Sequence, residues 1–257
     1  MIESKNTVER TLSILETVAH SSGGLTNSDI SRRLKLPKSS ASYILRILEH
    51  RGYLTRETNS GKYRLGLKLM GLTRESATHT DIREVAKPIM ESFVKRTNLS
   101  THLAVLDNGR AVYVEKVENP NSFIKMDIWV GHRLPVHSTA IGKVLLSEMP
   151  EAEVAAILEL RGMEKKTVKT ITNPKRYLKE LEKVRTFGFA VDDEENAGGV
   201  RCIASPIFDA QGKIAAALGT SDTIIRLDET QLPKIVEMVK KSAAQISNLI
   251  GFDEKSL

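Results

Sequence analysis

The residues best suited to chemistry lie between positions 37 and 48, where small hydroxyls and basic side chains alternate with apolar ones. Ala41, Ile44, Leu45 and Leu48 stand at spacings of 0, 3, 4 and 7, which predicts a helix that turns them toward a core. The opposite face carries hydroxyls, a ring and cations, which suit phosphates and base edges. These residues are Lys38, Ser39, Ser40, Ser42, Tyr43 and Arg46. We therefore expect a helix that reads DNA.

A plainer interpretation applies to the serines. A serine at a helix start is often only an N-cap, and this accounts for Ser39 or Ser40 individually. It does not account for several DNA-compatible residues on one face. Arg46 is in addition long enough for a bidentate contact to a guanine edge.

Two helices should precede this one. Asn6 with Glu9, and Thr26 with Asp29, have the spacing of capping boxes and predict where the two helices start. Pro37 should set the turn before the third helix. In the first helix we expect one buried apolar stripe, made by Val8, Leu12, Leu15 and Ala19.

A hairpin should follow the third helix. Residues 53–65 alternate on both sides of Asn59-Ser60-Gly61, which predicts two strands and a turn. Three helices and such a wing make a winged helix-turn-helix. Its expected phosphate contacts are Arg56, Lys62 and Arg64. The alternative is a winged-helix module that contacts proteins, because a fold alone does not fix a function.

The charge is concentrated in the same region. Residues 1–66 carry 11 Lys and Arg against 6 Asp and Glu, whereas the other 191 residues carry 27 against 26. Nearly all of the net charge of +6 therefore lies in the first quarter of the chain. A basic N-terminal segment on a near-neutral remainder favours a segment that binds polyanions. The alternative is a solvated surface that confers solubility.

Composition sets the limits for the remainder. With 257 residues the chain is long enough for two domains, and no stretch is apolar enough to span a bilayer. The first residues lack the apolar region of a signal peptide, so we expect a cytoplasmic protein without membrane partners. A single cysteine, Cys202, excludes an internal disulfide and a cysteine-rich metal site. We expect no metal and no cofactor.

The body should be a separate α+β domain of helices and antiparallel hairpins. We expect the winged helix-turn-helix over 5–66, a linker helix over 67–80 and the second domain over 81–252. Leu65, Leu69 and Leu72 suggest that a helix leaves the wing already at Leu65. Its expected elements are a helix from Asp81, a hairpin of 101–106 with 111–117, a strand over 122–130, a helix through 141–145, helices after Pro150 and Asn173-Pro174, a hairpin of 200–208 with 213–220, and a helix over 229–250.

Several blocks in order resemble the IclR family of bacterial transcriptional regulators. They are 36–39 (LPKS), 131–143 (GHRLPVHSTAIGK), 188–195 (GFAVDDEE) and 202–208 (CIASPIF), so the resemblance runs from end to end. It implies a GAF-like effector domain that binds a small carboxylated metabolite. It also implies a homodimer, or a dimer of dimers, on a near-palindromic double-stranded operator. Most such proteins repress transcription, and some activate it.

An effector site is expected where the body blocks converge. Ser138, Thr139 and Ala140 should form a strand-to-helix corner, with Ser138 or Thr139 as the N-cap and free N–H groups for a carboxylate. The resemblance places Asp192, Val200, Cys202 and Ser221 at pocket-lining positions. The family often has a hydroxyl where this chain has Gly219, which argues against an identical ligand. Alternatively, Cys202 only fills the core and Asp192 belongs to a solvated acidic run.

Catalysis is not expected. The sequence contains no Gly-x-x-x-x-Gly-Lys run, no Gly-x-Ser-x-Gly elbow and no His-Glu-x-x-His motif. A nucleophilic pair of Cys202 and His137 would require the fold to bring the two together, and no spacing suggests this. A further alternative is a DNA-binding scaffold without any effector.

Overall fold

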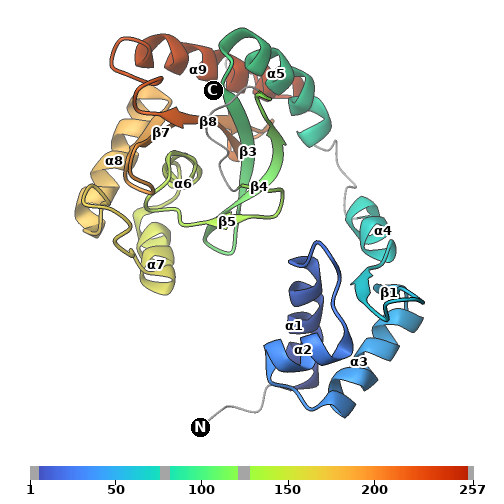
Figure 1. Cartoon of the computed structure of the whole chain (residues 1–257). Coiled ribbons are helices and arrows are strands. Elements are labelled where there is room, and N and C mark those ends of the chain that lie inside the picture. The colour runs from blue at the N-terminus through green and yellow to red at the C-terminus, as the bar shows by residue number, and fades with distance from the viewer. Residues whose placement is uncertain (1–5, 76–81, 121–127, 254–257) are drawn as a thin grey trace. The chain divides into compact units, whose positions relative to one another are not determined.

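The computed structural model describes residues 6–75, 82–120 and 128–253 (Figure 1). These residues form two compact units, which divide between His79 and Thr80. Each unit has its own hydrophobic core, so each is described by itself.

Unit 1 is a winged helix-turn-helix, as predicted. Both predicted capping boxes are present: Asn6 bonds with Glu9, and Thr26 bonds with Asp29. The elements are α1 (Thr7–Ala19), α2 (Asn27–Leu34), α3 (Lys38–His50), β1 (Leu54–Arg56), β2 (Tyr63–Leu65) and α4 (Lys68–Glu75), with β1 and β2 antiparallel.

The predicted stripe of α1 is wrong. Ile14 and Val18 are the buried residues of this helix, whereas Val8 and Leu12 are 66% and 54% exposed and Ala19 is exposed. Two overlapping apolar stripes run along α1, and Ile14 and Val18 lie in the core shared with α2 and α3. Of the predicted stripe, only Leu15 packs against this core, and it is half-buried.

The predicted start of the linker helix is also corrected. Leu65 ends β2 and forms part of the ladder with Leu54, so it cannot begin a helix. Helix α4 instead begins at Lys68. Residues 76–81 lie outside the described residues, so the further course of the linker stays a prediction.

Unit 2 is a six-stranded antiparallel sheet with helices on both faces, in the order β5-β4-β3-β8-β7-β6. Helices α5 and α9 pack together on one face and α6 lies on the other (Figure 1). The elements are α5 (Ile82–Thr97), β3 (Ser100–Asp107), β4 (Arg110–Val117), β5 (Arg133–Leu134), α6 (Ala140–Leu146), α7 (Glu151–Arg161), α8 (Pro174–Phe187), β6 (Ala190–Asp193), β7 (Val200–Phe208), β8 (Ile214–Thr223) and α9 (Leu232–Leu249).

Both predicted hairpins are present. Asn108 and Gly109 turn the first one with positive φ values of 47° and 66°, which the short turn requires. The sequence did not reveal β5 or β6. Helix α9 begins at Leu232 instead of 229, because the Asp228 side chain accepts the N–H groups of Thr230 and Gln231 in a turn.

The predicted strand over 122–130 is not found where it can be checked. Residues 121–127 lie outside the described residues, and 128–130 are not a strand.

Candidate functional site

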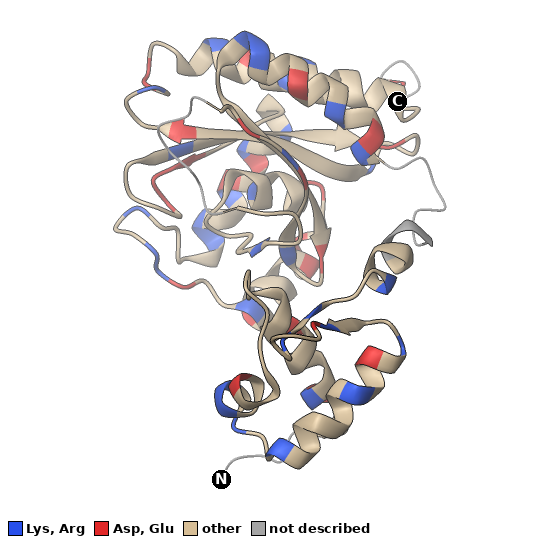
Figure 2. Cartoon of the chain, turned by 45° about the vertical axis from the view of Figure 1, so that its right-hand side comes forward, with Lys and Arg blue, Asp and Glu red and all other residues tan. Residues whose placement is uncertain are grey.

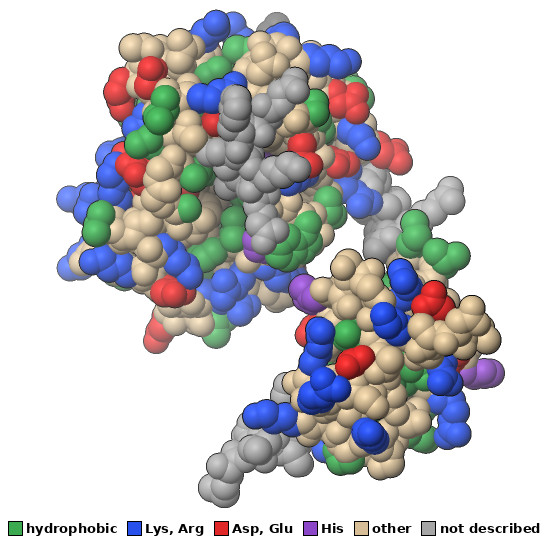
Figure 3. Space-filling view, viewed as in Figure 1, with side chains coloured by type: hydrophobic (Ala, Val, Ile, Leu, Met, Phe, Trp, Pro, Cys, Tyr) green, Lys and Arg blue, Asp and Glu red, His purple; other side chains and the backbone are tan. Residues whose placement is uncertain are grey.

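The predicted reading face of α3 lies on the surface of unit 1. Ala41, Ile44, Leu45 and Leu48 are buried, as predicted. On the other side Tyr43 is 55% exposed, Ser40 is half-buried, and the remaining members Lys38, Ser39, Ser42 and Arg46 are exposed. Figure 2 marks the Lys and Arg positions along the ribbon of this unit, and Figure 3 shows their side chains distributed over its surface. Their contacts to DNA stay predictions.

The serines of α3 do not cap it. Its N-cap is Pro37, and no side chain makes a capping hydrogen bond there. The plain capping interpretation of Ser39 and Ser40 is therefore wrong, and their hydroxyls remain available on the outer surface of the helix.

The three predicted phosphate contacts of the wing differ in their surroundings. The Arg56 guanidinium lies over the Tyr63 ring, 5.6 Å from its centroid, while Arg64 is exposed and Lys62 is half-buried. The turn is not uniformly basic, because the Ser60 hydroxyl donates to the Glu57 carboxylate there.

Unit 2 contains a small cavity at the start of α6, over the middle strands of the sheet. Five of the seven predicted effector residues line it: Thr139, Ala140, Asp192, Cys202 and Ser221. Its volume is about 20 Å³, room for about one water molecule. The lining residues that the sequence did not suggest are Tyr113, Leu134, Ile141, Asn196, Ile203 and Thr220, together with Gly219.

Two predicted residues do not line the cavity. The Ser138 hydroxyl donates to the Asn196 amide oxygen at 3.1 Å, so it supports the wall from behind. Val200 lies further along β7, where its carbonyl accepts the Glu194 N–H at 3.0 Å. Of the two proposed N-caps, Thr139 is the one used, because its hydroxyl oxygen accepts the Gly142 N–H.

Strand register brings the polar lining residues together. Asp192 pairs with Cys202 across β6 and β7, and Cys202 pairs with Ser221 across β7 and β8. Directly paired residues point to the same face of a sheet, so residues 29 positions apart in sequence meet here. The Ser221 hydroxyl donates to the Cys202 sulfur at 3.1 Å.

Asp192 is buried, which rules out the interpretation that it belongs to a solvated run. Its Oδ1 accepts the backbone N–H groups of Glu195 at 2.7 Å and Asn196 at 3.2 Å. Burial, the dominant influence, raises the pKa of this carboxyl to about 7 despite these two bonds. The group is therefore protonated in a large fraction of molecules at neutral pH, and then donates a hydrogen bond.

The thiol in the cavity is held in its protonated form. Burial raises the pKa of the Cys202 thiol well above its usual range, and the nearby Asp192 adds to this effect. The His137 ring is bonded to the Glu164 carbonyl at 3.0 Å, and no contact between His137 and Cys202 is present among the described residues. No pair for nucleophilic catalysis exists at these positions.

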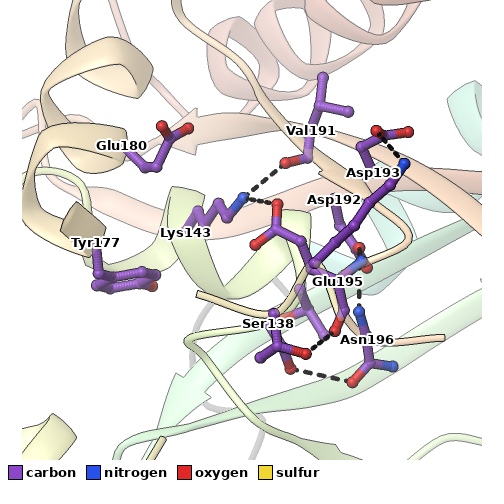
Figure 4. Close-up of polar contacts among 12 residues, drawn as sticks. Ser138, Lys143, Tyr177, Glu180, Val191, Asp192, Asp193, Glu195 and Asn196 are labelled. Carbon is purple, nitrogen blue, oxygen red and sulfur yellow. Dashed lines mark hydrogen bonds and ion pairs between the residues drawn. The ribbon is translucent and has the colours of Figure 1, made fainter. Parts of the chain in front are cut away.

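A buried ion pair lies just outside the cavity. Lys143 is 1% exposed, and its ammonium donates to a carboxylate oxygen of Glu195 and to the Val191 carbonyl at 2.8 Å (Figure 4). The sequence analysis missed this pair. A signal was present, because Lys143 stands in the otherwise apolar segment 140–146 and a buried ammonium needs a partner.

The absence of the family's hydroxyl at position 219 has a steric reason. A Cβ atom on Gly219 would lie 2.9 Å from the Ile141 side chain on α6. A larger residue fits only if the Ile141 side chain shifts, so the glycine permits the close approach of this side chain to β8.

The described residues contain no group of His, Cys, Asp and Glu that could hold a metal ion. In the same residues, no helix combines the length and apolarity needed to cross a membrane.

A winged helix-turn-helix followed by an α/β domain with a small cavity is the architecture of a DNA-binding transcriptional regulator. Comparison with protein families agrees: the IclR helix-turn-helix domain matches residues 7–58, and the bacterial transcriptional regulator IclR C-terminal domain matches residues 74–248. The chain belongs to the IclR family of bacterial transcriptional regulators, as its sequence blocks suggested.

Named relatives are similar over nearly the whole chain. The HTH-type transcriptional regulator XynR of Escherichia coli is 36% identical, over 95% of this chain and 97% of its own. The HTH-type transcriptional repressor AllR of Escherichia coli is 31% identical, over 95% and 90%. A solved IclR homologue of Microbacterium hydrocarbonoxydans, complexed with 4-hydroxybenzoate, has a TM-score of 0.83 and 27% identity, over 95% and 99%.

Proposed function

We propose that this protein is a repressor that binds a near-palindromic operator as a homodimer or dimer of dimers, and that a small carboxylate in the cavity of unit 2 controls the binding. The observation that carries the proposal is the small cavity that Asp192, Cys202 and Ser221 line with the start of α6, in the same chain as a winged helix-turn-helix. The name of AllR as a repressor and the 4-hydroxybenzoate bound to the Microbacterium homologue support it.

The lining suits a carboxylate because it offers hydrogen-bond donors without a fixed negative charge. Neutral Asp192 and the Tyr113 hydroxyl can each donate a hydrogen bond, and the Ser221 hydroxyl can do so when it turns from the Cys202 sulfur to the ligand. The first N–H groups of α6, at Ala140 and Ile141, have no acceptor within the helix. An ionised Asp192 would repel the same ligand.

The size of the cavity links ligand binding to a conformational change. Sites for small molecules usually enclose about 300–1,000 Å³, much more than the space present here. A ligand can therefore bind only to an expanded state, in which α6 or the turn after β6 moves outward. A ligand that favours one of two states shifts their populations, and this provides the free energy for regulation.

Self-association is proposed from exposed apolar side chains in unit 1. Val8 and Leu12 on α1 are exposed, and so are Leu67, Met70 and Leu72 in and just before α4. Large apolar side chains exposed on one unit can mark protein interfaces. Two reading helices in such a dimer would contact half-sites about one helical turn apart, or a multiple of that distance.

The proposal is tested by selecting DNA from a random duplex pool at two salt concentrations, then titrating the selected probe with small carboxylates, 4-hydroxybenzoate among them. An enriched near-palindrome and a carboxylate that releases it support the proposal. An enriched motif that no carboxylate affects would favour a regulator without an effector. Salt-sensitive binding without a motif would contradict sequence-specific repression.

Replacing Arg46 should relax sequence preference. If the guanidinium reads a guanine, Arg46→Ala should lose about 1–3 kcal/mol on the selected operator and discriminate less at one base pair. Titrations with the operator and with single-base variants measure this loss. Arg51→Ala, the same loss of charge just beyond the end of α3, is the matched control. Unchanged selectivity in the Arg46 variant would remove that residue from the reading face.

Replacing Lys62 should weaken binding evenly. A lysine that contacts a phosphate releases a counterion, so Lys62→Ala should lower affinity for all duplexes and reduce the slope of log affinity against log salt by about 0.9. Lys179→Ala, in unit 2, should leave the slope unchanged. A loss confined to one sequence would contradict the phosphate role of Lys62.

A further inference from the structure

The cavity has two polar walls that come from different parts of the chain. One is the start of α6, with Thr139, Ala140 and Ile141. The other is the end of β6 and the turn after it, with Asp192 and Asn196. The two walls are about 50 residues apart in the sequence, so their spacing depends on contacts between α6 and this turn.

One buried contact joins the walls outside the cavity. Lys143 lies on α6, directly after the turn of helix that faces the cavity, and its ammonium bonds to Glu195 in the turn and to the Val191 carbonyl in β6 (Figure 4). The Glu195 N–H in turn donates to Asp192. A chain of bonds thus runs from α6 through Lys143 and Glu195 to a carboxyl group that lines the cavity.

The ion pair is poorly explained by stability alone. Both side chains are almost fully buried, and the second carboxylate oxygen of Glu195 has no hydrogen-bond partner in the structure. Removing two charges from water costs several kcal/mol, and attraction offsets this cost only when the remaining polar atoms are satisfied. On the exposed side of the same turn, the Lys169 ammonium forms ion pairs with the carboxylates of Asp193 and Glu194. The buried pair therefore fits a role in fixing geometry.

We propose that Lys143 is a positioning residue of the effector site: through its buried bonds to Glu195 and Val191 it holds the turn that carries Asp192 and Asn196 against α6. Neither Lys143 nor Glu195 lines the cavity. The inference rests on the proposed function for its role in ligand binding, but the geometric coupling can be tested without a ligand.

Cys202 provides that test, because it is the only cysteine in the chain and lines the cavity. A dithiodipyridine reagent is too large for the present cavity, so its reaction rate with the full-length protein reports opening of the walls. We expect Lys143→Met to react at least about tenfold faster than the wild type, as expected when a local closed state loses a specific contact. Lys169→Met, which removes the exposed ion pairs of the same turn, should react at nearly the wild-type rate.

Loss of overall stability must be separated from loss of positioning. Ile246→Ala creates a cavity under α9, on the other face of the sheet, and lowers stability without touching the effector site. At equal free energy of unfolding, Lys143→Met should still react faster than Ile246→Ala. If Lys143→Met does not fold, Lys143→Met with Glu195→Met removes both charges and takes its place. A rate no faster than that of Ile246→Ala in the variant that folds would overturn the inference.

Failure of the proposed function gives a different result. Protection of wild-type Cys202 by small carboxylates, 4-hydroxybenzoate first, reports whether such a ligand enters. Because the ligand binds only the expanded state, a carboxylate that protects the wild type should protect Lys143→Met at concentrations at least about tenfold lower, and equal protection would overturn the ligand part of the inference. If no carboxylate protects the wild type, the proposed effector class fails, while the difference in reaction rates still decides the role of Lys143.

Discussion

Gly142→Ala should destabilise unit 2 by about 3 kcal/mol or more, because the added methyl group meets backbone atoms. A Cβ atom on Gly142 would lie 2.3 Å from the backbone oxygen and Cα of Val136, and backbone cannot move aside as a flexible side chain can. Accommodating the methyl group requires α6 to move away from the 135–137 segment. Urea denaturation followed by circular dichroism measures the change.

A matched control is available in the same unit. Gly198 has open space where a Cβ atom would stand, so Gly198→Ala should leave stability nearly unchanged. The movement of α6 also predicts a functional effect, since its first turn lines the cavity. Equal stability of the two variants would show that α6 tolerates displacement.

The buried face of a helix could be predicted from the sequence where the helix carries a single apolar stripe, because only that stripe can pack against the core. In α3, Ala41, Ile44, Leu45 and Leu48 form a single apolar stripe, and that stripe is buried. In α1 two stripes overlap, and the choice between Val8 with Leu12 and Ile14 with Val18 depends on how the helices pack, which spacing alone does not contain.

The cavity was only partly predictable for a related reason. Residues quoted from family blocks, such as Asp192 and Cys202, lie in it because the register of β6 and β7 aligns them. Tyr113 and Asn196 are brought there by tertiary contacts from other segments, and nothing in their local sequence marks them. The acidic run from Asp192 to Glu195 suggested solvated surface, yet its first and last residues point inward, where Lys143 bonds the last.

The burial of Asp192 predicts an unusual pH dependence of stability. Its pKa is about 7 in the folded protein, against an ordinary value of 3.8. The folded state therefore holds its proton between about pH 4 and pH 7 while the unfolded chain releases it, and this contribution to stability is lost as the pH rises. Three pH units correspond to about 4 kcal/mol. His102, whose pKa burial lowers to about 4, acts in the opposite sense, so the wild-type curve alone does not separate the two.

Asp192→Asn isolates the contribution of the carboxyl group. The amide oxygen can still accept the N–H groups of Glu195 and Asn196, but the side chain no longer titrates. The free energy of unfolding of the variant, relative to the wild type, should therefore rise by about 4 kcal/mol between pH 4 and pH 7. Urea denaturation at a series of pH values measures this difference.

Asp193→Asn is the control, because the neighbouring carboxyl has the opposite shift. Bonds from Lys169 and Arg201 lower the pKa of Asp193, so its contribution to the free energy of unfolding is already complete above about pH 5. The free energy of unfolding of Asp193→Asn, relative to the wild type, should therefore stay constant from there to pH 7. A flat curve for Asp192→Asn as well would mean that Asp192 is ionised inside the folded protein. A fixed negative charge in the cavity would then exclude a carboxylate effector, whereas the expected slope leaves a neutral donor in place to bind one.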